Sequence, residues 1–230
     1  MRPALVALLC ALIPFVTVHA TFIYSVVTGH FAACVPYLEG CVSISRAARS
    51  GDSIHLFRAL MLPMATVLVL YWLTVFQWLR QLYYKISRGM RVMRVLGVIG
   101  ALFLILYATF LGTEGDVYRW LRRYGVIVYF AFTALAQLLF TQRLYQLGKR
   151  QVINKLFFLA HCKIVLCIVM LVLGVISAVI DLTVQDRSFK SALDNIIEWN
   201  FALLMTGYFF FSFLMFKKTG FELQYRLKQP

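Results

Sequence analysis

The chain has 230 residues, of which 62% are hydrophobic, and a formal net charge of +14. Soluble globular domains are about 45–50% apolar, so this composition excludes a soluble domain and indicates a polytopic membrane protein. A strong positive charge is typical of nucleic-acid-binding proteins, but it is equally typical of the cytosolic loops of membrane proteins. The positions of the charges along the chain therefore decide between these two interpretations.

Six apolar runs are long enough to cross a bilayer as helices, which requires about 20 residues each. The expected ranges are 4–27, 59–79, 95–112, 124–141, 156–180 and 196–216. The first run also resembles a signal peptide that ends at Ala20, but its apolar character continues beyond that residue, which favours an uncleaved helix. We therefore predict an all-α, six-transmembrane-helix bundle that forms a single transmembrane domain over residues 1–230. The only long polar segment is the loop between the first two runs, at about 29–58.

The basic residues are distributed unequally between the two sides of this predicted bundle. The side with both termini holds 14 lysines and arginines and a single acid, Glu222, whereas the opposite side holds eight basic and eight acidic residues. Because basic loops stay in the cytosol, we expect both termini to be cytosolic and the long loop to be non-cytosolic. This distribution explains the net charge, so no nucleic acid is expected as a partner. The expected location is an endomembrane or the plasma membrane, or the inner membrane if the protein is bacterial.

Two cysteines, Cys34 and Cys41, lie in the long loop. Disulfides are permitted on the non-cytosolic side of a membrane, and these two residues are close enough in sequence to pair. Pairing cannot be deduced from sequence, so a disulfide and two free thiols both remain open.

Three segments of the chain carry a resemblance to a known family. They are the loop with Val35-Pro36-Tyr37 and Ser43-Ile44-Ser45, the start of the last run at Ile197-Glu198-Trp199, and the aromatic exit of that run at Phe211-Ser212-Phe213-Leu214. The chain resembles the six-helix membrane family of DRAM autophagy modulators, Sfk-type proteins and post-GPI-attachment lipid-remodelling factors. The resemblance implies a role in lipid handling or lipid remodelling. The chain departs from the family pattern where Gly51-Asp52-Ser53 replaces a Pro-Glu-like turn.

Charged residues on the non-cytosolic side are candidates for binding a phospholipid or glycolipid headgroup. Arginines suit a phosphate because the guanidinium fork binds it in a bidentate manner. The candidate arginines on this side are Arg46, Arg49, Arg58, Arg119, Arg122 and Arg123. We predict Arg46, Arg58 and Arg122 as the headgroup ligands. Asp181 and Glu198 lie at the non-cytosolic ends of the last two runs, and acids within a membrane span are functional candidates by default. Ion pairing among these residues is the alternative.

A catalytic alternative uses Ser45, His19 and Glu198 as nucleophile, base and orienting acid. It predicts an intramembrane acyl hydrolase or acyltransferase, in which the three side chains converge. No Gly-x-Ser-x-Gly elbow presents the serine, so a non-catalytic role is favoured and the question of enzyme activity stays open. A third possibility is a scaffold that binds another membrane protein without a ligand.

Metal binding and a reactive site in the fifth run are the remaining candidates. The spacing of His30, Asp52 and His55 matches no standard metal site, so neither a metal nor another cofactor is expected. Lys163 lies inside the fifth run, and we expect its side chain to extend toward the cytosolic headgroups while its stem packs on apolar surface.

Overall fold

The computed structural model describes residues 2–83, 85–149 and 156–222. Within these ranges it contains eight α-helices and no strand, and six of the helices are long and apolar enough to cross a membrane. These six are α1 (Pro3–Val27), α4 (Ser53–Leu82), α5 (Arg88–Phe110), α6 (Asp116–Lys149), α7 (Phe157–Thr183) and α8 (Arg187–Thr219). The predicted all-α, six-helix membrane bundle is therefore confirmed.

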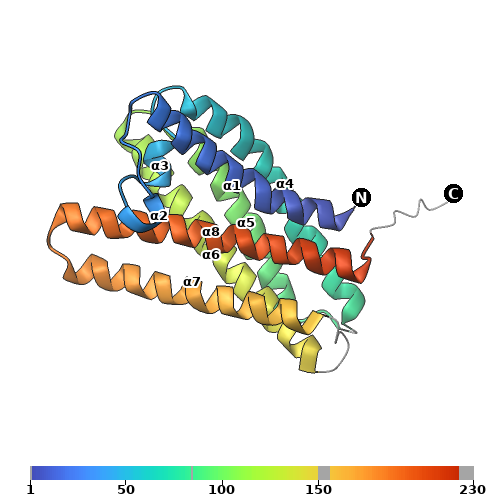
Figure 1. The fold of residues 1–230 in the computed structure, drawn as a ribbon. Coiled ribbons are helices and arrows are strands. Elements are labelled where there is room, and N and C mark those ends of the chain that lie inside the picture. Colours follow the sequence, from blue (N-terminus) through green and yellow to red (C-terminus); the bar gives the residue numbers. More distant parts are fainter. Residues whose placement is uncertain (1, 84, 150–155, 223–230) are drawn as a thin grey trace.

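The six long helices form a closed ring in chain order. Each packs against the next, and α8 returns to pack against α1. Consecutive long helices run in opposite directions, as in other up-and-down bundles. Because the number of long helices is even, α1 begins and α8 ends at the same end of the bundle (Figure 1). That shared end carries the basic turns; its cytosolic location stays a prediction from the charge distribution.

Several helices are longer than the apolar runs that predicted them. α4 begins at Ser53 rather than at residue 59, and α8 begins at Arg187 rather than at residue 196. The Asp186 side chain caps α8 by accepting hydrogen bonds from the backbone N–H groups of Ser188 and Phe189. An N-cap satisfies backbone donors that have no intrahelical partner, so a helix can continue into polar sequence. Because α4 begins earlier than predicted, the loop between α1 and α4 is shortened to residues 28–52.

Lys163 is the clearest correction to the sequence interpretation. Its side chain is 0% exposed and does not extend toward the headgroups. The Nζ atom donates a hydrogen bond to Ser212 Oγ at 2.7 Å, and it lies 4.2 Å from the ring centre of Phe140 and 4.1 Å from that of Tyr208. The aromatic faces attract a cation most strongly where water is excluded. The prediction that Lys163 reaches the cytosolic headgroups is therefore wrong.

α7 is the most peripheral of the six long helices. Its most apolar window is the least buried of the six, and its main packing partners are α6 and α8. In Figure 1, α7 runs alongside α8 and comes close to α6 at the end of the bundle where α6 ends and α7 begins. Toward the other end, the two helices diverge, and a groove lies between them.

Candidate functional site

The segment between α1 and α4, residues 28–52, folds back over the end of the bundle opposite the start of α1 (Figure 1), and we call it the lid. It contains two short helices, α2 (Pro36–Glu39) and α3 (Ile44–Ala47). A disulfide joins Cys34 to Cys41, with a Cα–Cα distance of 6.7 Å. This bond closes a small covalent loop that contains α2, and α2 lies against α8 (Figure 1).

The lid is held on α8 by side-chain amide and indole N–H groups that donate to lid carbonyls. These bonds join Asn195 to Gly40, Trp199 to Val42 and Asn200 to Tyr37, at 2.7, 2.8 and 3.0 Å respectively. All three donors lie within six residues of one helix, and each reaches a carbonyl of the lid. The lid is thus an ordered part of the bundle.

Gly40 allows this close approach. It has a φ of 62° at the C-cap of α2, a conformation that glycine adopts without strain. A Cβ atom at this position would collide with the backbone of Ala192 in α8. Any larger residue would therefore push the lid away from α8.

Glu198 of α8 lies beneath the lid, next to Ser45 in α3 of the lid. The Glu198 carboxylate accepts hydrogen bonds from the backbone N–H groups of Ile44 and Ser45, at the start of α3. The Ser45 hydroxyl instead bonds to the hydroxyl of Tyr107 on α5, at 2.8 Å. Glu198 therefore helps to position the lid, and its side chain also lines the groove between α6 and α7.

His19 contacts a different part of the lid. Its Nδ1 lies 2.7 Å from the Phe15 carbonyl and its Nε2 lies 2.9 Å from the Tyr37 hydroxyl. A carbonyl only accepts, so Nδ1 carries the proton, and Nε2 of the neutral ring accepts from Tyr37. Burial raises the pKa of Tyr37, which keeps that hydroxyl protonated as the donor.

The proposed catalytic residues are therefore near one another but not connected as a relay. His19 and Glu198 line the same small cavity of about 40 Å³. The hydrogen bonds of Ser45 and His19 go to Tyr107, Tyr37 and Phe15, and in the described part of the chain none joins Ser45 to His19. A nucleophilic serine needs a hydrogen bond to its base, and this arrangement does not supply one.

The three arginines proposed for headgroup binding have separate surroundings. Arg58 donates to the carbonyls of Ala108 and Leu111 at the end of α5, at 3.3 and 2.6 Å. It therefore satisfies carbonyls that a helix end leaves without partners. Arg46 is exposed on the lid, and Arg122 is half-buried on α6. The structure does not bring these three side chains together in one cradle.

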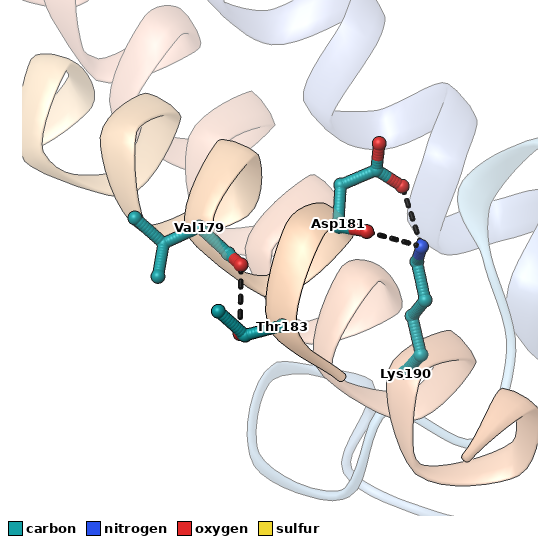
Figure 2. Close-up of polar contacts among 4 residues, drawn as sticks. All are labelled: Val179, Asp181, Thr183 and Lys190. Atoms are coloured by element: carbon teal, nitrogen blue, oxygen red, sulfur yellow. Dashed lines mark hydrogen bonds and ion pairs between the residues drawn. The ribbon is translucent and has the colours of Figure 1, made fainter. Parts of the chain in front are cut away.

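Asp181 and Lys190 link the ends of α7 and α8. Figure 2 shows the Lys190 ammonium between the side chain and the backbone carbonyl of Asp181. The nitrogen lies 3.1 Å from that carbonyl. The pair therefore links the two helices at their turn, beside the open end of the groove.

The groove itself runs between α6 and α7, with α8 as its floor, and encloses about 990 Å³. Most of its lining is apolar and comes from the facing sides of α6 and α7. Its charged residues gather at the lid end, which we call the mouth. The mouth residues are Ser45, Arg123, Asp181, Asp194 and Glu198. A space of this size is within the range of ligand-binding sites.

Asp194 is the mouth residue that the sequence reasoning did not propose for any site. Asp194 was expected in a loop, but α8 extends past it, and residues four apart on a helix share a face. Asp194 therefore lies on the same face as Glu198 and lines the groove with it. A longer helix prediction would have found this pair. Arg123 was one of the six arginines considered for a headgroup, although it was not among the three chosen.

Six membrane-spanning helices, an ordered lid and a lateral groove define an integral, multi-pass membrane protein. Residues 3–219 match the family model described as the Frag1/DRAM/Sfk1/Cwh43P N-terminal domain. The chain belongs to this family, as the segments around Ser43-Ile44-Ser45 and Ile197-Glu198-Trp199 predict. No curated protein and no solved structure matches the chain significantly.

Proposed function

We propose that this protein binds one phospholipid or glycolipid molecule in the groove, near the non-cytosolic leaflet, as part of lipid handling or remodelling. The observation that carries this proposal is the groove between α6 and α7, which is mostly apolar along its length and has its charged residues at its mouth. A lipid has the same polarity pattern, with acyl chains beneath a headgroup. The membrane location of the six helices supplies the ligand at high local concentration.

The length of the groove suits an acyl chain. Its lining on α7 extends from Cys167 to Asp181, and 14 steps of 1.5 Å give about 21 Å. Half of a bilayer hydrocarbon core is about 15 Å thick. A chain that enters from the non-cytosolic leaflet is therefore accommodated along its full length.

Small side chains create the space. Ala131 and Ala134 on α6 and Gly174 and Ala178 on α7 all line the groove. In membrane bundles such residues usually allow two helices to approach closely, but here they border an open volume. A Cβ added at Gly174 would meet no atom within 4 Å.

Gly174→Leu is therefore the direct test. The added side chain occupies the groove, and replacing glycine inside a helix favours folding by about 1 kcal/mol. Gly207→Leu on α8 is a matched control, since its Cβ also meets open space and it does not line the groove. Native mass spectrometry of the purified proteins should show bound lipid on the wild type and on Gly207→Leu, and several-fold less on Gly174→Leu. Equal lipid occupancy in the two variants would contradict the proposal.

A further inference from the structure

We infer that the mouth of the groove selects a headgroup that carries both a phosphate and a primary ammonium group, as in phosphoethanolamine. This inference rests on the proposed lipid-binding function and assigns a chemical class to the ligand. It follows from the charges that remain available in the mouth once the contacts within the protein are accounted for.

Two of the three mouth acids already have partners. Asp181 is paired with Lys190, and the Glu198 carboxylate meets the backbone N–H groups of Ile44 and Ser45. Asp194 is half-buried and, among residues 2–83, 85–149 and 156–222, makes no hydrogen bond or close ion pair. Carboxylates that are removed from water without a partner are costly, so a cationic ligand group beside Asp194 lowers the free energy of the complex.

Arg123 provides the complementary charge. It is exposed on α6, and its guanidinium makes no hydrogen bond to any residue that the structure describes. It is close enough to Asp181 to interact electrostatically, which places it on the α7 side of the mouth. A guanidinium binds phosphate through two parallel hydrogen bonds. One available guanidinium and one available carboxylate match a zwitterionic headgroup.

An anionic headgroup fits this mouth poorly. It would bring a net negative charge close to Asp194 and Glu198, and like charges repel strongly where water is partly excluded. The two arginines that might have compensated, Arg46 and Arg58, do not line the groove. The arrangement therefore favours lipids without net charge over lipids with a net negative charge.

A quaternary ammonium fits less well than a primary one. Choline-type groups are usually held in cages of aromatic faces. The aromatic side chains of the groove are Phe130 and Phe201, which pack edge to face at 5.7 Å and so form no such cage. A primary ammonium can donate hydrogen bonds directly to the Asp194 carboxylate.

The test compares three lipids with identical acyl chains. The delipidated full chain is incubated with equimolar phosphatidylethanolamine, phosphatidylcholine and phosphatidylglycerol, and the retained lipid is measured by native mass spectrometry. One charge-assisted hydrogen bond corresponds to about 10-fold in affinity, so phosphatidylethanolamine should exceed each of the others by about that factor. Retention of phosphatidylglycerol or phosphatidylcholine at the same level would overturn the inference.

Two variants assign the preference to the mouth. Asp194→Asn should lower phosphatidylethanolamine to the level of phosphatidylcholine without changing the melting temperature, whereas Asp52→Asn, an exposed acid on the lid, should change neither. Arg123→Gln should lower all three phospholipids. An unaltered preference in Asp194→Asn would overturn the inference.

The Gly174→Leu variant distinguishes a failure of the inferred headgroup preference from a failure of the proposed lipid binding in the groove. If Gly174→Leu lowers all three lipids but the wild type shows no headgroup preference, the groove binds lipid and only the inference fails. If Gly174→Leu changes none of them, lipid binding in the groove fails as well.

Discussion

Trp199→Phe tests how firmly the lid is attached to the bundle. The Trp199 Nε1 atom donates to the Val42 carbonyl at 2.8 Å, and the two residues are 1% and 0% exposed. Phenylalanine keeps an aromatic ring at this position but removes the donor. A buried carbonyl that loses its partner costs about 1–3 kcal/mol. In a chain of this size, a loss of about 2 kcal/mol corresponds to about 4–8 °C in Tm.

The assay is thermal unfolding in detergent, followed with a dye that fluoresces on reaction with thiols. Cys10 and Cys167 are buried free cysteines, so they react only as the helices separate. Trp120→Phe is the matched control, because Trp120 on α6 is 60% exposed and its indole N–H has no hydrogen bond within the described ranges. Exposed substitutions usually change stability by less than about 0.5 kcal/mol.

The expected result is a lower Tm for Trp199→Phe and an unchanged Tm for Trp120→Phe. If the two variants melt at the same temperature as the wild type, the hydrogen bond to Val42 contributes no net stability. The attachment of the lid would then have to come from the two asparagine bonds and the packing of α2 on α8.

The remaining predictions concern the disulfide, the α5 end and the α8 cap. Loss of a disulfide that closes eight residues should cost about 2.5 kcal/mol by chain entropy, so a reducing agent should lower the Tm of the wild type but not that of the Cys34→Ser/Cys41→Ser double variant. Arg58→Ala should destabilise by about 1.5–3 kcal/mol, the value of hydrogen bonds to a charged group, while Arg46→Ala, an exposed arginine on the lid, should melt like the wild type. Hydrogen bonds from the Ser188 hydroxyl and nearby backbone N–H groups lower the pKa of Asp186 below its ordinary value of 3.8. The charged cap therefore stabilises the fold above that ordinary pKa, and this contribution is lost as the pH falls through the lowered pKa. Asp186→Asn should weaken the dependence of Tm on pH between about 5 and 3, a window set by the ordinary pKa of Asp, and an unchanged dependence would show that the cap does not titrate with folding.

The sequence predicted the number and class of the helices well, because lipid imposes a simple rule. A segment that crosses a bilayer must satisfy its backbone internally and present apolar side chains over about 20 residues. The rule applies only at membrane depth. It therefore did not predict the polar extensions of α4 and α8; the start of α8 is set by the Asp186 cap rather than by hydropathy.

Lys163 shows why hydropathy cannot determine side-chain direction. A lysine in an apolar run can extend toward the headgroups or point into the bundle, and both fit the same local sequence. Its actual partners, Ser212, Phe140 and Tyr208, lie on α6 and α8. Only the packing of the three helices shows that an inward-pointing lysine side chain finds a hydrogen-bond acceptor and two aromatic faces.

The candidate site divides in the same way. The sequence alone identified a six-helix membrane protein, the family-marking loop and Glu198 as an unusual acid, because composition and motif are local properties. Tertiary structure decided which charges share a surface: it assigned Arg58 to the end of α5, separated Ser45 from His19 and placed Asp194 with Glu198 at the mouth of the groove. The physical reason is that a charge acts on what lies within a few ångströms of it in space, and these neighbours come from helices far apart in the chain.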